Sequence, residues 1–171
     1  TSNSKKIEFI QNKSFELCLF LSLPASMALI VASEEITSAL FGYGAFDATS
    51  VLNSSKALYY FALGLPAFAI IKVFSTFLFA RNNTKTPFYY SLISVLVNIS
   101  ISIIFFSKVG FIIIPIATSI SSWVNALLLF LKLYTNNHFR LSNIINLTNF
   151  KILSISIITT YFFSYLINLC K

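Results

Sequence analysis

Charge is scarce in this sequence: only 10% of its 171 residues are Asp, Glu, Lys or Arg, whereas 57% are hydrophobic. An ordinary soluble domain is about 25% charged and slightly under half apolar. Too few polar side chains are present to cover the surface of a globule of this size in water. Composition therefore excludes a soluble domain and predicts an integral membrane protein.

Acidic residues are the rarer of the two signs, because 5 Asp and Glu stand against 12 Lys and Arg, a formal net charge of +7. In a soluble protein such an excess would suggest nucleic acid as a partner. Here the basic residues lie between apolar runs instead of forming one stripe for phosphates to follow. Nucleic-acid binding is therefore not expected. Instead, the basic residues are expected to retain the loops at the anionic cytoplasmic face of a membrane.

The residues that carry most catalytic and metal chemistry are also few. The chain has one histidine, His138, and two cysteines, Cys18 and Cys170, outside any metal or redox spacing. Glu34 and Glu35 are adjacent, so on a helix they point about 100° apart and form no shared acid–base pair. The sequence predicts no catalytic residue, no metal site and no cofactor, so no enzyme.

What the sequence does have is five long apolar runs, each near the ~20 residues that a helix needs to cross a bilayer core of ~30 Å. Each run is too long for a barrel strand of about ten residues, so helices are the expected spanning form. Residues 1–171 are therefore expected to form a single all-α transmembrane domain. The predicted spans are residues 17–33, 57–79, 88–107, 109–131 and 152–169.

Local signals refine these spans. Pro24, Pro66 and Pro115 fall inside them, where each removes a backbone hydrogen bond and favours a kink. Pro87 instead opens the third span, at a first-turn position where its missing N–H costs nothing. Between the first two spans, Asp47 is a reasonable N-cap for a long helix, after a turn in which Gly42 and Gly44 flank Tyr43.

The Lys and Arg residues predict an orientation with the N-terminus in the cytoplasm and the C-terminus of this chain in the periplasm. The competing interpretation is a secretory signal peptide that ends near Ser33. The polar segment that precedes the apolar run is long for a signal peptide, which argues against this interpretation. Eight basic residues fall on the predicted cytoplasmic side: Lys5, Lys6, Lys13, Arg81, Lys85, Lys132, Arg140 and Lys151. Three fall on the other side: Lys56, Lys108 and Lys171.

Polar residues recur at helical spacing inside two spans, as Ser91, Ser94, Asn98 and Ser102 and as Thr118, Ser121, Ser122 and Asn125. Two interpretations stay open: helix–helix packing through hydrogen bonds of roughly 1 kcal/mol or less each, or the wall of a hydrated cavity. Lys72 is the one formal charge inside a span, roughly 10 Å from its inner end. It either snorkels to the interface or faces a water-filled cleft that receives an anionic substrate.

Four stretches resemble one family, the lipid II flippases (MurJ/MviN). They are ALGLPAFAIIKV at 62–73, FARNNTKTP at 79–87, IATSISSWVNALL at 116–128 and LFGYGAF at 40–46. The second is similar to the family pattern YARxDTKTP, the third to ATSLSAWVNALLL and the fourth to LFxRGAF. The chain departs from the family at Asn83, where an acidic residue is usual.

The resemblance implies the second lobe of a multidrug/oligosaccharidyl-lipid/polysaccharide (MOP, MATE-like) exporter fold, with the N-terminal lobe missing from this fragment of a larger transporter. It also implies a function: moving the lipid-linked peptidoglycan precursor, lipid II, across the bacterial inner membrane for cell-wall synthesis. Lys72, Asn98 and Asn125 are then the candidates for the substrate cavity. The alternatives are a truncated, non-transporting membrane scaffold, or a related exporter of drugs or other polysaccharide lipids.

The loop at 79–87 has a structural role in this interpretation. Thr84 is expected to cap the helix that Pro87 opens. Arg81 and Lys85 are expected to hold the loop on the cytoplasmic side and to meet lipid headgroups. Membrane lipids, the transported precursor and the missing lobe are the partners expected.

Overall fold

The computed structural model describes residues 2–44, 47–136, 139 and 147–169, and these residues form helices and turns without a strand. Five helices are long: α1 (Ser2–Val31), α3 (Ala48–Phe79), α4 (Lys85–Val109), α5 (Ile113–Thr135) and α7 (Leu147–Leu169). Two are short: α2 (Ser33–Phe41) and the 3-10 turn η1 (Gly110–Ile112). The prediction of an all-α membrane fold is confirmed.

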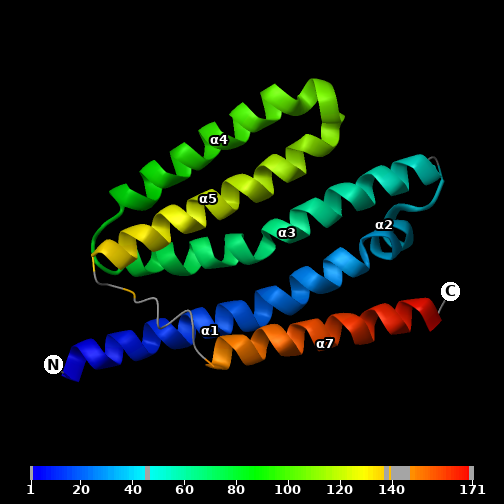
Figure 1. Cartoon of the computed structure of the whole chain (residues 1–171). Helices are drawn as coiled ribbons and strands as arrows, with labels where there is room; N and C mark the ends of the chain where they lie inside the picture. Colours follow the sequence, from blue (N-terminus) through cyan, green and yellow to red (C-terminus); the bar gives the residue numbers. More distant parts are fainter. Residues whose placement is uncertain (1, 45–46, 137–138, 140–146, 170–171) are drawn as a thin grey trace.

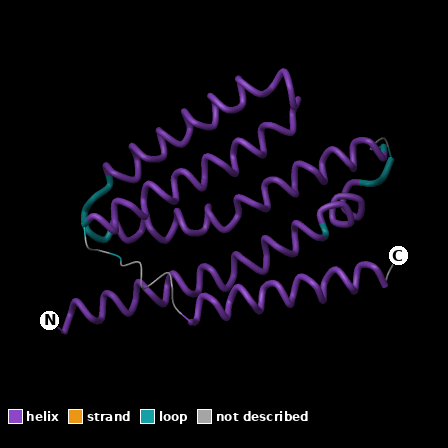
Figure 2. The backbone as a smooth tube through the Cα atoms, viewed as in Figure 1, coloured by secondary structure: helices purple, strands orange, loops and turns teal. Residues whose placement is uncertain are grey.

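The long helices lie side by side in one row, in the order α4, α5, α3, α1, α7 (Figure 1). The long helices alternate in direction along the chain, so α1, α4 and α7 run one way and α3 and α5 the other, and α1 begins at one end of the row and α7 finishes at the other (Figure 2). The turn between α3 and α4 lies at the end where α1 begins, and the turn between α2 and α3 lies at the opposite end. A single row leaves large apolar faces of its helices open on both sides.

Four stretches of the described helices are long and apolar enough to cross a membrane: Lys6–Val31, Ala48–Phe79, Lys85–Thr135 and Thr148–Ile167. The third is 51 residues long and holds two helices, α4 and α5. Gly110 divides them, because its φ of 72° lies in the left-handed region that glycine enters without steric cost.

This turn also corrects the expectation for Pro115. Because η1 occupies 110–112, α5 begins at Ile113, which places Pro115 third in its helix. A first-turn proline has no intrahelical hydrogen bond to lose, so the predicted kink at Pro115 is wrong. Pro24 and Pro66 do lie inside helices, α1 and α3.

The connection between α1 and α3 is built as the sequence predicts. Asp47 is the N-cap of α3, and its Oδ1 accepts a hydrogen bond of 2.9 Å from the Ser50 N–H. The hydrogen bonds from Ser50 and Thr49 lower the pKa of the Asp47 carboxyl below its ordinary value. Gly42 ends α2 and Gly44 has a φ of 65°, which confirms the turn around Tyr43.

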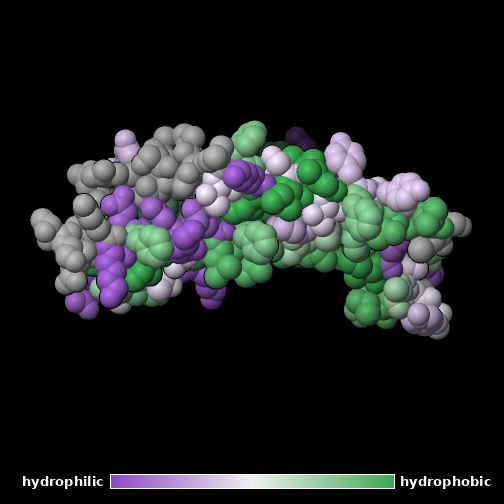
Figure 3. Space-filling view, turned by 90° about the horizontal axis from the view of Figure 1, so that it is seen from below, coloured by the Kyte–Doolittle hydropathy of each residue, from purple (hydrophilic) through white to green (hydrophobic). Residues whose placement is uncertain are grey.

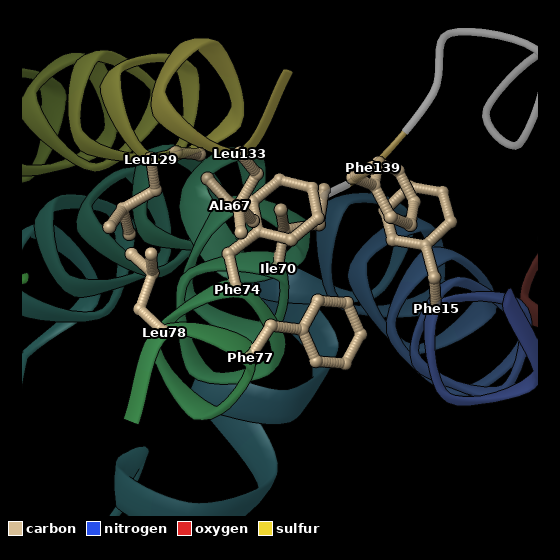
Figure 4. Close-up of a cluster of buried hydrophobic side chains, with 10 residues drawn as sticks. Phe15, Ala67, Ile70, Phe74, Phe77, Leu78, Leu129, Leu133 and Phe139 are labelled. Carbon is tan, nitrogen blue, oxygen red and sulfur yellow. The ribbon is translucent and has the colours of Figure 1, made fainter. Parts of the chain in front are cut away.

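Aromatic side chains form the core at the end of the row where α1 begins (Figure 4). Phe74 of α3 stacks on Phe15 of α1, with ring centroids 5.7 Å apart and planes within 3°. Phe139, which follows α5, meets both rings edge-on at 5.5 Å. This cluster joins α1, α3 and the chain beyond α5, and such ring pairs add about 0.5–1.5 kcal/mol each beyond the area they bury.

Outside this core the surface is apolar. Figure 3 shows hydrophobic side chains across the middle of one face and the most hydrophilic ones toward the end where α1 begins. Ile103, Ile158 and Leu96 are examples of large apolar side chains that are more than half exposed. Exposure of this extent in the middle of long helices is expected where lipid covers them.

Candidate functional site

The polar residues of α4 and α5 face each other. Ser94 Oγ donates to the Ser121 carbonyl at 2.7 Å, and Asn98 Nδ2 donates to Thr118 Oγ1 at 3.0 Å. Asn98 Oδ1 in turn accepts from Ser102 Oγ at 3.4 Å. These are the contacts expected of helix packing in a membrane, where neighbouring helices satisfy polar groups that lipid cannot. A shallow groove of 240 Å³ lies over the same residues.

Asn125 lies one helical turn beyond Ser121 on α5 and is only 6% exposed. Its Oδ1 is buried and accepts no hydrogen bond within the described part of the chain. It therefore lies inside the helix row, whereas Asn98 lies at the edge of the 240 Å³ groove.

Lys72 lies on the face of α3 that its neighbours leave open. The exposed residues of this face recur at helical spacing: Phe61, Phe68, Lys72, Thr76 and Phe79. The backbone carbonyl of Lys72 accepts a hydrogen bond of 2.8 Å from Thr76 Oγ1. Within the described residues, no hydrogen bond joins the Lys72 side chain to Asn98 or Asn125. Lys72 thus lies on the open face of α3, whereas Asn98 is hydrogen-bonded at the contact between α4 and α5.

Sequence reasoning missed a group of side chains around the kink proline of α3. Pro66 has no N–H, so it cannot donate to the Ala62 carbonyl four residues earlier. Ser26 Oγ, from α1, donates to that carbonyl at 2.6 Å. The side chains that support the kinked segment thus come from a neighbouring helix, which is how membrane helices tolerate proline.

The helix on the other side of α3 contributes two further donors to the same segment. Trp123 Nε1 donates to the Leu63 carbonyl at 3.1 Å, and Ser119 Oγ donates to the Tyr60 carbonyl. Three carbonyls within about one turn of α3, at positions 60, 62 and 63, therefore receive side-chain hydrogen bonds from α1 and α5. The turn of α3 that precedes Pro66 is thus held from both sides.

Gly64 permits the close approach of α3 and α5 at this point. A Cβ built on Gly64 would lie 2.8 Å from Ser119 Oγ and 3.1 Å from Ser119 Cα. The first distance is shorter than the distances that real Cβ atoms keep from neighbouring atoms. Only glycine therefore fits between α3 and α5 at their present separation. The motif at 62–73 and the motif at 116–128 thus pack directly on each other.

The loop between α3 and α4 is a tight, hydrogen-bonded turn. Asn82 adopts a positive φ of 57°, and the Asn83 N–H closes the helix end by donating to the Leu78 carbonyl at 3.0 Å. Arg81 Nη1 donates to the Phe77 carbonyl at 2.8 Å, which places its positive charge at the negative end of the α3 dipole. Partial burial lowers the pKa of the Arg81 guanidinium, which nevertheless stays charged near neutral pH.

The cap of α4 differs from the expectation. Thr84 occupies the N-cap position, but its side chain makes no capping hydrogen bond. Asn83 Oδ1 instead accepts from the Thr86 N–H at 3.1 Å. The prediction that Thr84 caps the helix is therefore wrong, because its αR backbone (φ −89°, ψ −22°) is not the extended one that usually aims an N-cap side chain. Lys85 is exposed in the first turn.

Comparison with known proteins decides the family. The model of the family described as "Lipid II flippase MurJ" matches residues 1–171. This chain belongs to the MurJ family. The family motifs at 62–73, 79–87 and 116–128 are therefore the segments that form the part of α3 around Pro66, the α3–α4 turn and the α5 face packed on α3.

Individual relatives agree over most of the chain. A probable lipid II flippase MurJ of Rhizobium meliloti (strain 1021) is 43% identical over 129 residues, which are 75% of this chain and 24% of that protein. A protein of the same description from Rhizobium tropici is 40% identical over 134 residues, 78% of this chain and 25% of that protein. The chain thus spans about a quarter of the length of these MurJ relatives.

A solved structure has the same fold. The structure entitled "Lipid II flippase MurJ, inward closed conformation" matches with a TM-score of 0.79 and 32% sequence identity, over 92% of this chain and 32% of that one. The row of helices is accordingly part of a MOP-type flippase fold.

Proposed function

We propose that this chain forms part of a flippase that moves lipid II, the lipid-linked peptidoglycan precursor, across the bacterial inner membrane. The observation that carries the proposal is the match of the MurJ family model over residues 1–171. The open faces of the helix row support a second lobe as partner, because a polar headgroup crosses between two lobes in alternating-access transporters. The chain contributes one wall of that path.

The orientation proposed is N-terminus in the cytoplasm and C-terminus of this chain in the periplasm. Lys132 lies in the last turn of α5 and Arg81 follows the end of α3, at the end of the row where α1 begins. Lys108 lies in the last turn of α4, at the opposite end. The excess of basic residues at the first end supports a cytoplasmic location for it.

Within this lobe, Lys72 is the residue proposed to meet the substrate. It carries positive charge on the uncovered face of α3, and lipid II carries an anionic pyrophosphate. A charge inside a membrane span is energetically costly, and the charged residues found there usually have a function. We assign Asn98 and Asn125 to the contact between α4 and α5, since Asn98 is hydrogen-bonded there and Asn125 is buried one turn beyond Ser121, to which Asn98 also donates.

The proposal is tested in a chimera in which this chain replaces the matching segment of the Rhizobium meliloti relative, with leaflet transfer of lipid II measured in vesicles. The chimera is expected to transfer lipid II. Lys72→Ala is expected to slow transfer roughly fivefold, as loss of one exposed charge contact of about 1 kcal/mol does, and Lys72→Arg to retain most of it.

Lys108→Ala is the matched control, because it removes a lysine from the last turn of α4 and is expected to leave transfer unchanged. A chimera that inserts at normal levels but transfers no lipid II would favour a scaffold function. Normal transfer by the Lys72→Ala variant would remove Lys72 from the mechanism.

A further inference from the structure

A pocket of 410 Å³ lies at the end of the row that holds α2, between α2, the first turns of α3 and the turn that joins α4 to α5. Its volume is within the ~300–1,000 Å³ typical of small-molecule sites. Two residues of opposite charge line it, Glu34 at the start of α2 and Lys56 in α3. It lies away from the open face of α3 that carries Lys72, so the proposed transport function does not use it.

The two charges of the pocket lack an ion-pair partner among the described residues. Within the part of the chain that the structure describes, the ion pair that forms is Lys13–Glu16, at 2.8 Å, and neither Glu34 nor Lys56 takes part in one. Both side chains are exposed. A ligand with only a negative charge would be repelled by Glu34, and one with only a positive charge by Lys56. A zwitterion matches both.

The remaining walls suit an amphiphile. Val109, Ile112 and Ile116 provide an apolar side, and Tyr59 and Tyr60 provide an aromatic one. Tyrosine is enriched at the depth of lipid headgroups, where one end of its ring meets hydrocarbon and the other meets water. The pocket lies near the ends of its helices, which is the depth at which headgroups are found.

The walls are also held in place before any ligand arrives. The rings of Tyr59 and Tyr60 pack edge to face, with centroids 5.3 Å apart and an interplanar angle of 88°. The Tyr60 carbonyl accepts a hydrogen bond from Ser119 Oγ, and Ser55 Oγ donates to the Leu52 carbonyl at 2.9 Å. A preformed site loses less conformational entropy on binding.

We propose that this pocket binds the headgroup of phosphatidylethanolamine. Its phosphate accepts hydrogen bonds from Lys56, its primary ammonium donates to the Glu34 carboxylate, and its first acyl carbons lie along Ile112 and Ile116. Such charge-assisted hydrogen bonds are the stronger class and depend on donor geometry, so a quaternary amine, which has no N–H, is a poorer ligand.

The test is native mass spectrometry of the full chain in detergent with equimolar phosphatidylethanolamine, phosphatidylglycerol and phosphatidylcholine of identical acyl chains. Phosphatidylethanolamine adducts are expected to exceed each of the others roughly three- to tenfold, the range that one or two charge-assisted contacts give. Equal adducts for the three lipids, or a preference for phosphatidylglycerol, would overturn the proposal. This comparison of the three lipids uses the unsubstituted chain.

Variants then assign the two charges. Glu34→Gln is expected to abolish the preference for phosphatidylethanolamine, Lys56→Gln to weaken binding of both phosphatidylethanolamine and phosphatidylglycerol, and Glu34→Lys to shift the preference to phosphatidylglycerol. Lys13→Gln and Glu16→Gln make the same chemical changes in the ion pair at the other end of the row. These controls are expected to keep the preference, and a preference that survives Glu34→Gln contradicts the assignment.

Discussion

Replacing Gly64 by leucine is expected to separate α3 from α5 and to cost about 3 kcal/mol or more of stability. The Cβ alone would lie 2.8 Å from Ser119 Oγ and 3.1 Å from Ser119 Cα, and the second of these atoms belongs to the backbone. Overpacking of a well-packed contact typically costs about 1–3 kcal/mol, and leucine adds three further carbons. Gly64→Ala is expected to cost less, because alanine adds only the Cβ and also regains about 1 kcal/mol of helix propensity over glycine.

The measurement is the free energy of unfolding in mixed micelles, followed by circular dichroism. Ser100→Leu is the control, because Ser100 is exposed on α4, where an added leucine meets lipid. Ser119→Ala in the Gly64→Ala background removes the closer of the two contacts and is expected to restore part of the stability. A Gly64→Leu variant as stable as the Ser100→Leu variant would contradict the close approach of α3 and α5.

Ser26→Ala is expected to destabilise the chain by about 1–2 kcal/mol, more than the roughly 0.6 kcal/mol of an average hydrogen bond between membrane helices. The reason is the acceptor: the Ala62 carbonyl lacks a donor at position 66, and a buried carbonyl left without a partner costs about 1–3 kcal/mol. The free energy of unfolding in the same micelles measures the effect.

A double-mutant cycle separates this explanation from a general packing effect. Pro66→Ala supplies an N–H at position 66, which can donate to the Ala62 carbonyl within the helix. Ser26→Ala is therefore expected to cost clearly less in the Pro66→Ala background than in the natural one. Equal costs in the two backgrounds would show that Ser26 does not compensate for the proline.

The helices were predictable because their signals are local. Apolar runs long enough to cross a bilayer predicted five helices, and Asp47 predicted the start of α3, since a capping side chain acts within three residues of its own position. The polar stripes of α4 and α5 were also visible, because spacings of three and four residues define a helix face. Only the structure shows that Asn98 faces Thr118 across the contact.

The features that the sequence did not predict correctly have a common cause. They depend on residues that are neighbours only in space, or on small differences in backbone angles. Ser26 lies 36 residues from the carbonyl it serves, and no spacing rule connects the two. Pro115 was misplaced because the left-handed Gly110 ends α4 and starts a new helix two residues before that proline. Thr84 and Asn83 are both good capping residues by type, and the backbone at the turn decides between them.

The most direct test of the membrane fold is the labelling of single cysteines by a water-soluble maleimide in lipid nanodiscs, in a chain carrying Cys18→Ser and Cys170→Ser. Tyr43→Cys in the α2–α3 turn is expected to react readily. Leu96→Cys and Ile103→Cys, at positions on α4 that are 57% and 73% exposed, are expected to stay unlabelled until the lipid is replaced by denaturant. Labelling of both α4 positions in nanodiscs as fast as at Tyr43→Cys would show that water, not hydrocarbon, covers these helices.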